Sequence, residues 1–344
     1  MRIEDFDYDL PPAAIAQEPL PERDQSRLLV LERSSGRLEH RTFRELPTLL
    51  AAGDLIVVNR SRVRQARLLG QRPGGGRAEV LLVERLESGE WEALVRPARR
   101  LRPGDRVSIS AAVAVQVVSG PLGVDGRRRV RIEAAEPDAE RVLEQLGHTP
   151  LPPYIRRAAH AGDRERYQTL YAREPGSVAA PTAGLHFSHA VLADLAQRGI
   201  DRAELVLHVG PGTFQPVRAR EVENHRVEAE PFAVEPAVCA AVTRARARGG
   251  RVVAAGTTTV RALETAATAD GTPGVRSGRT DLVIAPGYRF RVVDALVTNF
   301  HLPRSSLLLL VAAFAGREQV LGAYREAIRS GYRFYSYGDA MLIL

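Results

Sequence analysis

HAVLADLAQRG (189–199) opens a run of four segments that continues with AELVLHV (203–209), AVCAAVTRARARG (237–249) and RVVAAG (251–256). The first and third place apolar residues at helical spacing and end at a glycine, which predicts helices. The second and fourth are short apolar runs typical of strands. Helix and strand alternate in this way across residues 180–312. This pattern predicts a mixed α/β (α+β) domain in which helices flank a sheet.

The N-terminal part predicts the start of the same domain. RLLVLER (27–33) and RLEHRTF (37–43) are expected to form two strands across a Ser-Ser-Gly turn. LPTLLAAGD (46–54) suggests a short helix ending at Gly53, and LIVVN (55–59) a buried strand. The final segment, YRFYSYGDAMLIL (332–344), is expected to add a last strand to the sheet.

The stretch between these parts has a different character. About six short β-like runs, separated by turns such as GGG and RPGD, predict a small antiparallel barrel or sandwich. DAERVLEQLG (138–147) then predicts a helix. Because α/β patterning resumes afterwards, residues 64–150 are expected to form an inserted β-barrel domain. Residues 1–63 and 151–344 would together form the catalytic domain.

Composition restricts the class of protein. The 344-residue chain has a single cysteine, Cys239, and its N-terminus lacks the pattern of a secretory signal. The longest apolar run, SLLLLVAAFA (306–315), is half the length of a membrane helix. Histidines and acids show no metal-site spacing. We therefore expect a cytoplasmic protein with no membrane association, structural disulfide or bound metal.

The chain contains no lysine, and all 48 basic residues are arginine. Schiff-base chemistry, pyridoxal phosphate and a Walker-type phosphate loop all need lysine and are thereby excluded. A GC-rich genome explains the arginine bias. The net charge of +7 nevertheless favours partners that carry phosphate, with nucleic acid first among them.

Four clusters of small, polar and histidine-bearing residues interrupt the apolar runs. They are VAAPTAGLHFS (178–188), LHVGPGTFQPVR (207–218), VVAAGTTTVRALE (252–264) and LVTNFHLPRSS (296–306). Each couples a β-rich segment to a turn, and loops on rigid strands are where binding and catalysis usually occur. The candidate substrate-binding residues are Pro181, Thr182, Gly184, Gly210, Gly212, Thr213, Phe214, Thr257, Thr258, Thr259, Arg261, Asn299 and Phe300.

Each cluster also has a structural explanation. Thr257–Thr259 at a helix start, with Arg261, would hold a carboxylate or phosphate, but threonine is also an ordinary helix cap. Phe214 would stack on a flat ring or pack in the core. Asn299 and the two residues after it suggest base recognition or proton transfer. His186, His208 and His301 are candidate proton-transfer groups, although lone histidines are more often structural.

Several longer strings appear together in this chain. They include FDYDLPPAAIAQEPL (6–20), WEALVRPARRLRPGD (91–105), DRERYQTLYAREPGSVAAPTAGLHF (163–187), VDALVTNFHLP (293–303) and YRFYSYGDAMLI (332–343). With them the chain closely resembles, from end to end, the S-adenosylmethionine:tRNA ribosyltransferase-isomerases of the queuosine pathway. The resemblance implies a mixed α/β domain with a barrel-like sheet that carries a smaller β-barrel domain.

The resemblance also implies a reaction. The ribosyl part of S-adenosylmethionine would be transferred and isomerised onto 7-aminomethyl-7-deazaguanine at the tRNA wobble position, giving epoxyqueuosine-tRNA, adenine and methionine. S-adenosylmethionine is then a consumed substrate and no prosthetic group is needed. Its sulfonium acidifies the 5′-carbon, so a histidine would remove a proton there. His186, His208 and His301 are the residues expected to transfer protons. We expect the enzyme to act as a monomer.

This chain departs from the family pattern at three places. An Asn-Asp-Thr/Ser-Arg motif becomes Asn59-Arg60-Ser61-Arg62, and a His-x-Met-His-x-Glu motif has Glu228 in place of its second histidine. Thr259 replaces a common serine. The first two changes leave open a divergent enzyme that uses another amine acceptor, or a site in which the changes are compensated. A non-catalytic RNA-binding protein on the same scaffold is a further alternative.

Overall fold

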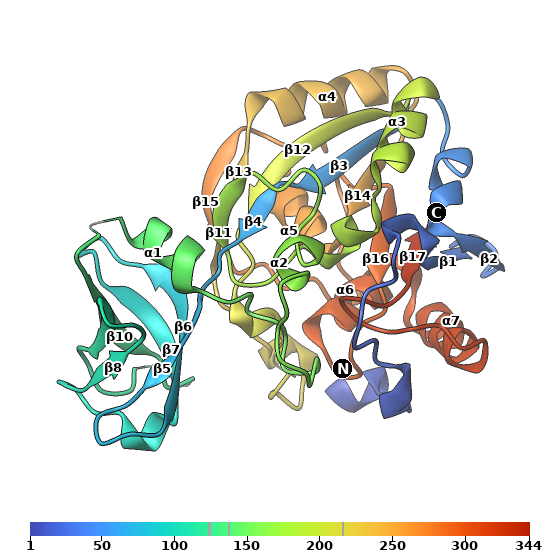
Figure 1. Ribbon diagram of the computed structural model, residues 1–344. Helices are drawn as coiled ribbons and strands as arrows, with labels where there is room; N and C mark the ends of the chain where they lie inside the picture. Colours follow the sequence, from blue (N-terminus) through green and yellow to red (C-terminus); the bar gives the residue numbers. More distant parts are fainter. Residues whose placement is uncertain (123–124, 137, 215–216) are drawn as a thin grey trace.

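A computed structural model describes residues 1–122, 125–136, 138–214 and 217–344. Its larger part is built on a nine-stranded mixed sheet, shown in Figure 1. In the middle of this sheet four neighbouring strands run parallel to one another. In spatial order the strands are β15 (Arg276–Thr280), β13 (Glu230–Val234), β12 (Asp201–Leu207), β3 (Leu55–Asn59), β14 (Val252–Ala255), β16 (Ala295–Asn299), β17 (Ala340–Ile343), β1 (Arg27–Leu31) and β2 (Leu38–Thr42).

Helices cover both faces of this sheet (Figure 1). Side chains alternate along a strand, so Leu29 and Leu31 of β1 enter one apolar cluster while Leu28 and Val30 enter the other. The first cluster includes residues of α4 (Pro236–Ala247), α5 (Thr257–Thr265), α6 (Ser306–Ala315) and α7 (Arg317–Arg329). The second includes residues of α3 (His189–Gln197) and the 3₁₀ helix η4 (Phe43–Thr48). Burial on both faces explains why β3 and β14 are continuous apolar runs.

The smaller part is a closed antiparallel barrel, seen at the left of Figure 1. Trp91 and Leu143, the latter from α1 (Ala139–Leu146), are buried in its core. Around the barrel the strands are β10 (Arg128–Ala134), β7 (Trp91–Arg96), β6 (Arg77–Arg85), β5 (Arg67–Gln71), β8 (Arg106–Ser108) and β9 (Val113–Val117). The structure therefore has a barrel where the sequence left barrel and sandwich open.

The structure also contains a two-stranded sheet and several short helices. β4 (Ser61–Val63) pairs in parallel with β11 (Glu174–Ser177). The remaining short helices are η1 (Ile3–Phe6), η2 (Pro12–Ala14), η3 (Arg23–Gln25), η5 (Ala98–Arg100), α2 (Asp163–Arg166), η6 (Thr182–His186), η7 (Pro211–Phe214) and η8 (Val222–Asn224).

The mixed α/β class and the antiparallel barrel are confirmed, and most strand and helix predictions hold. The large sheet has β15 and β2 at its two edges, and the closed barrel belongs to the smaller part. One local prediction was wrong. The helix expected over residues 46–54 is instead the 3₁₀ helix η4, which begins at Phe43 and ends at Thr48. Glu45 explains the shift: its carboxylate accepts hydrogen bonds from the Thr42 backbone N–H and hydroxyl, which fixes the start.

Helix length was also checked against the thickness of a membrane. In the described ranges no single helix is both long and apolar enough for a span. α6 and α7 meet the criterion only as a pair, and the two are bent by 113° at the break between them.

Candidate functional site

Three parallel strands end beside polar clusters at one edge of the large sheet. His208 directly follows β12, Thr257 lies shortly after the end of β14, and Asn299 is the last residue of β16. The carboxyl ends of parallel strands meet at one edge, which is where ligands bind in open α/β sheets. The fourth cluster, residues 178–188, joins them because the N–H groups of its first two residues donate to the Val209 carbonyl, at 2.8 and 3.2 Å.

The four clusters together line one cavity, here called cavity 1, with an empty volume of about 650 Å³. Cavity 1 therefore unites motifs that lie more than 100 residues apart in the chain. The predicted residues that line it are Pro181, Thr182, Thr213, Thr257, Thr258, Asn299, Phe300 and His301.

Other predicted residues lie elsewhere. Gly184 is packed so closely that a Cβ there would lie 2.3 Å from the Tyr171 hydroxyl, so its role is to permit packing. Thr259 is fully buried and its hydroxyl donates to the Ala255 carbonyl at 2.8 Å. Gly210 and Gly212 line neighbouring cavities. The side chain of Phe214 lies outside the described part of the chain, so its stacking stays a prediction.

His301 is the one predicted histidine that lines cavity 1. Its Nε2 lies 2.8 Å from the Thr298 hydroxyl, and its backbone is held by the hydroxyls of Tyr8 and Tyr324. Within the described residues its Nδ1 has no hydrogen-bond partner. Burial lowers the pKa of His301 to about 3, so the imidazole is neutral at pH 7. A neutral, fixed imidazole on a cavity can accept a proton.

His186 is placed differently, behind the cavity wall. Its Nε2 lies 3.0 Å from Asn299 Nδ2, and its Nδ1 lies 2.8 Å from the Ser26 hydroxyl. Asn299 Nδ2 also donates to the Tyr335 carbonyl at 3.1 Å, which fixes that atom as the amide nitrogen. His186 Nε2 must then be an acceptor, with the proton on Nδ1. Its lone pair is thus occupied, and burial, with Arg333 and Arg23 nearby, lowers its pKa to about 3.

His208 lies on a third cavity, here called cavity 3. Its Nδ1 is 2.7 Å from the Ser61 hydroxyl, which in turn lies 2.6 Å from the Ser177 hydroxyl. Burial first, and Arg64 second, lower the pKa of His208, so it too is neutral at pH 7. Gly176 makes room for it, since a Cβ there would lie 2.3 Å from the imidazole ring. The three histidines therefore occupy three distinct positions.

The two fully buried histidines predict an acid-sensitive fold. The pKa of His186 and His301 is about 3 in the folded protein and near 6.5 in the unfolded chain, so below pH 6.5 only the unfolded state binds these protons. Their effect on stability is absent above pH 6.5 and grows as the pH falls towards 3. We expect them to lower the free energy of unfolding by about 4 kcal/mol between pH 7 and pH 5.

Urea unfolding at the two pH values measures this loss. His301→Gln has one fewer such histidine, so it should lose about 2 kcal/mol less than the parent protein over the same interval. An identical loss in both proteins would show that His301 is not responsible.

The start of α5 offers unpaired donors to cavity 1. Its N-cap is Gly256, with φ of 97°, and no side chain caps the helix. Thr257 and Thr258 both line the cavity, and the Thr258 hydroxyl is held by Asn59 Nδ2 at 3.3 Å. Free N–H groups and the helix dipole favour an anion here. The expectation that threonine would cap this helix is therefore not met, because glycine occupies the N-cap.

Arg261 faces away from this anion site. Its guanidinium donates to the Glu230 carboxylate, to the Leu282 carbonyl at 3.0 Å and to the Thr280 carbonyl at 3.1 Å. The same carboxylate accepts the Gly210 N–H at 2.8 Å. Arg261 thus anchors the Gly-Pro-Gly turn through Glu230, and its charge is already compensated. These contacts give Arg261 a structural role, and its expected contact with a substrate anion stays a prediction.

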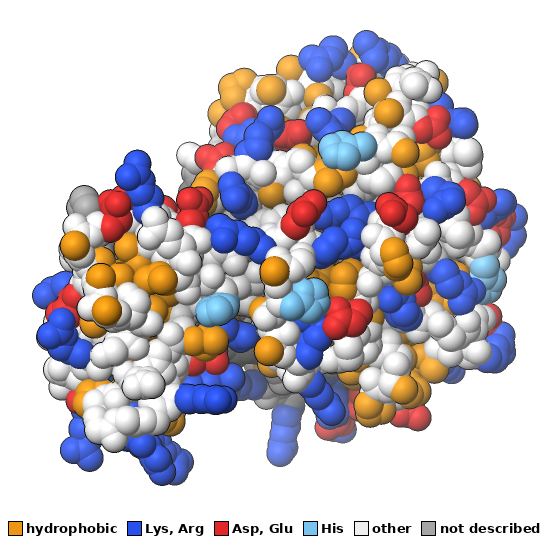
Figure 2. All heavy atoms as spheres, viewed as in Figure 1, with side chains coloured by type: hydrophobic (Ala, Val, Ile, Leu, Met, Phe, Trp, Pro, Cys, Tyr) orange, Lys and Arg blue, Asp and Glu red, His pale blue; other side chains and the backbone are white. Residues whose placement is uncertain are grey.

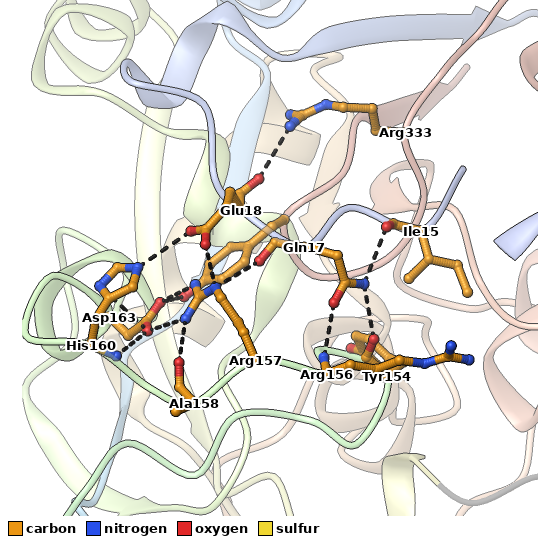
Figure 3. Close-up of polar contacts among 11 residues, drawn as sticks. Ile15, Gln17, Glu18, Tyr154, Arg156, Arg157, Ala158, His160, Asp163 and Arg333 are labelled. Carbon is orange, nitrogen blue, oxygen red and sulfur yellow. Dashed lines mark hydrogen bonds and ion pairs between the residues drawn. The ribbon is translucent and has the colours of Figure 1, made fainter. Parts of the chain in front are cut away.

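Sequence reasoning missed the aromatic wall of cavity 1. Tyr154 and Tyr335 line it and stack on each other, with ring centroids 4.3 Å apart and an interplanar angle of 24°. Figure 3 shows how the Tyr154 segment is held: Gln17 Nε2 donates to the Tyr154 carbonyl at 3.0 Å. Nearby, Arg157 binds both carboxylate oxygens of Asp163, at 2.6 and 2.8 Å. The proline-rich segment PLPPYIRR (150–157) predicted only a linker, and nothing in its sequence indicated that Tyr154 lines a cavity.

Two larger cavities adjoin cavity 1. Cavity 2, of about 1210 Å³, shares Thr213 with it, and cavity 3, of about 660 Å³, shares Val209. Both include residues of the smaller part as well as the larger one. Figure 2 shows arginine side chains spread over the visible face of both parts. The arginines that line the two cavities are Arg64, Arg85, Arg127, Arg218, Arg226, Arg261 and Arg279.

The two substitutions in the family motifs have different surroundings. Arg60 forms ion pairs with Glu174 at 3.2 Å and Glu235 at 2.5 Å and lines none of cavities 1 to 3. Glu228 lines cavities 2 and 3 and forms an ion pair with Arg127 of the smaller part. The change at residue 60 is therefore balanced by local acids, whereas that at residue 228 lies where a ligand would contact it. In the described ranges, no three His, Cys, Asp or Glu residues gather as metal ligands would.

Comparison with known proteins agrees with this architecture. A family model described as "Queuosine biosynthesis protein" matches residues 3–343. The S-adenosylmethionine:tRNA ribosyltransferase-isomerase of Moorella thermoacetica is 55% identical over 345 residues, with both chains covered completely. The same-named protein of Gloeobacter violaceus is 53% identical, over 98% of this chain and 95% of its own.

A solved structure is similar as well. The crystal structure of S-adenosylmethionine tRNA ribosyltransferase from Thermotoga maritima has 41% sequence identity and a TM-score of 0.57, over 99% of this chain and 100% of that one. The family model, the full-length identity and the shared fold agree. The chain belongs to the queuosine biosynthesis family of S-adenosylmethionine:tRNA ribosyltransferase-isomerases.

Proposed function

We propose that this enzyme transfers and isomerises the ribosyl moiety of S-adenosylmethionine onto 7-aminomethyl-7-deazaguanine at the tRNA wobble position. The products would be epoxyqueuosine-tRNA, adenine and methionine, and the enzyme would act in the cytoplasm as a monomer. The observation that carries the proposal is cavity 1, where four separate polar motifs meet beside two arginine-lined cavities. The names of the full-length relatives described above contain the same two substrates, S-adenosylmethionine and tRNA.

Cavity 1 suits the sulfonium nucleoside. The uncapped start of α5, with Thr257 and Thr258, would hold the methionine carboxylate, because the dipole and free N–H groups there favour a negative charge. Pro181 and Thr182, which also line the cavity, would contact the ligand. Tyr154 and Tyr335 supply flat aromatic surface near the site.

His301 is the residue proposed to remove the proton from the 5′-carbon. Burial makes its conjugate acid unfavourable in the empty cavity, which argues against a free imidazolium. Substrate binding changes that balance, because the sulfonium already brings one positive charge into the cavity. Proton transfer gives a sulfonium ylide with no net charge and an imidazolium, so the net charge in the cavity stays at one. The burial cost is therefore incurred at binding rather than in the chemical step.

The tRNA would approach through cavities 2 and 3. Arg85, Arg218 and Arg226 offer contacts to phosphates, and part of the cavity lining comes from the smaller part, which we propose is an inserted domain spanning residues 64–150. His208 would accept the proton that the aminomethyl nitrogen loses as it attacks, since its own lowered pKa leaves it unprotonated at pH 7. His186 would orient Asn299 rather than transfer a proton.

Adenine release tests the proposal. The protein is incubated with S-adenosylmethionine and tRNA that carries 7-aminomethyl-7-deazaguanine, and the nucleosides are then analysed by mass spectrometry. Release of adenine together with an epoxyqueuosine mass supports the proposal. Release of adenine with a different nucleoside product would identify an enzyme that uses another amine acceptor. The substitution at Glu228 favours this alternative. Tight tRNA binding without adenine release would indicate a non-catalytic RNA-binding protein.

A further inference from the structure

Two buried polar atoms on the wall of cavity 1 have no hydrogen-bond partner among the described residues. They are Asn299 Oδ1 and the Tyr335 hydroxyl, in residues that are 2% and 6% exposed. Unsatisfied buried groups are rare, because each loses its hydrogen bonds to water without replacement. Both residues line the same cavity. Their hydrogen-bonding capacity is thus available to a ligand.

The hydrogen bonds around Asn299 determine whether its side chain can still donate to a ligand or only accept from one. Its amide nitrogen is 3.1 Å from the Tyr335 carbonyl and 3.0 Å from His186 Nε2, so both N–H groups are used. An acceptor-only carbonyl at the first contact prevents the amide from turning over. Asn299 therefore presents only an acceptor to the cavity.

Tyr335 is held in place by its backbone. Its φ of 73° lies in the left-handed region, which a bulky residue adopts only when its surroundings impose it. Its N–H donates to the Phe300 carbonyl at 3.3 Å, and its carbonyl accepts from Asn299 and from Gly338. The ring is stacked on Tyr154. These contacts fix the position of Tyr335 in the lining of cavity 1, and its unpartnered hydroxyl can donate a hydrogen bond.

We propose that Asn299 and Tyr335 form the adenine-recognition subsite of cavity 1, with Asn299 Oδ1 accepting from the 6-amino group and the Tyr335 hydroxyl donating to a ring nitrogen. The inference rests on the proposed function, since it assumes that S-adenosylmethionine occupies this cavity. A 6-oxopurine presents an acceptor where the amino group was, and that acceptor would face the Asn299 oxygen. The subsite therefore selects 6-aminopurines, and His186 acts as the positioning residue that sets the orientation of Asn299.

Binding of two unreactive ligands tests this selectivity without tRNA. S-adenosylhomocysteine and its hypoxanthine counterpart, S-inosylhomocysteine, are titrated calorimetrically into the full-length protein. We expect the adenine form to bind about 10-fold to 100-fold more tightly, because the other leaves a buried acceptor facing an acceptor. Equal affinities would overturn the inference while leaving the proposed function standing. If neither ligand bound, the placement of the nucleoside in cavity 1 would fail, and the inference with it.

Tyrosine-to-phenylalanine changes separate recognition from folding. Tyr335→Phe removes an unpaired hydroxyl, so it should weaken S-adenosylhomocysteine binding about 10-fold without lowering Tm. Tyr332→Phe is the matched control, because its hydroxyl is bonded to His40 at 2.9 Å and Tyr332 does not line cavity 1. That change should lower Tm and leave ligand affinity unaltered. Unaltered affinity in Tyr335→Phe would contradict the assignment.

His186→Phe addresses the positioning role. Without the histidine acceptor, one N–H of Asn299 is freed and the amide is no longer held from both sides. We expect the affinity ratio between the adenine and hypoxanthine ligands to shrink towards one, which general loosening of the fold would not produce. A ratio that stayed at its original value in a folded variant would exclude His186 from this role.

Discussion

His301→Ala is expected to lower the rate of adenine release by about 10²-fold to 10⁴-fold, the usual contribution of a positioned proton acceptor. The imidazole lines cavity 1, is held by Thr298 at 2.8 Å and is neutral at pH 7. No other predicted histidine lines this cavity in the described residues, so no neighbour replaces it. The loss should appear in kcat, with S-adenosylhomocysteine affinity nearly unchanged, because the group acts in the transition state rather than in ground-state binding. Single-turnover adenine release measures it.

Two variants control for folding and for loss of a histidine as such. His301→Gln keeps a polar side chain at the site but removes the base, and it should be as inactive as the alanine variant. His189→Ala removes an exposed histidine of α3 that lines none of cavities 1 to 3, so it should retain full activity. A folded His301→Ala protein that released adenine at the parent rate would eliminate His301 as the base.

Arg261→Met is expected to lower the free energy of unfolding by about 3–5 kcal/mol, since it leaves a buried carboxylate uncompensated. The Arg261 and Glu230 side chains are only 10% and 9% exposed. Arg261 also satisfies two buried backbone carbonyls, those of Leu282 and Thr280. The Glu230 carboxylate in turn holds the Gly210 N–H. The loss should therefore extend to the turn between cavities 1 and 3, and urea unfolding measures the total.

An exposed ion pair provides the comparison. Arg248 and Asp201 lie 3.3 Å apart with side chains 57% and 52% exposed, so Arg248→Met should cost no more than about 1 kcal/mol. Adding Glu230→Gln to Arg261→Met should recover part of the larger loss, because it removes the uncompensated charge. Equal destabilisation by Arg261→Met and Arg248→Met would show that the buried pair does not stabilise the fold.

The sequence located the site motifs but not all of their roles. Pro181, Thr257, Asn299 and His301 were recognisable because each ends or interrupts a run of apolar residues, and all four line cavity 1. The role of Arg261 was not visible, since its partner Glu230 lies 31 positions away along the chain and reaches it because α5 packs against β13.

The sequence by itself determined the alternation of helix and strand, the β-rich stretch that forms the barrel and the family, because these depend on local periodicity and on contiguous motifs. Only the tertiary structure decided which residues of each cluster line the cavity. It separated His301 on the cavity from His186 behind it and added Tyr154 and Tyr335 as a wall. Such assignments depend on contacts between residues 100 or more positions apart, and no local pattern records them.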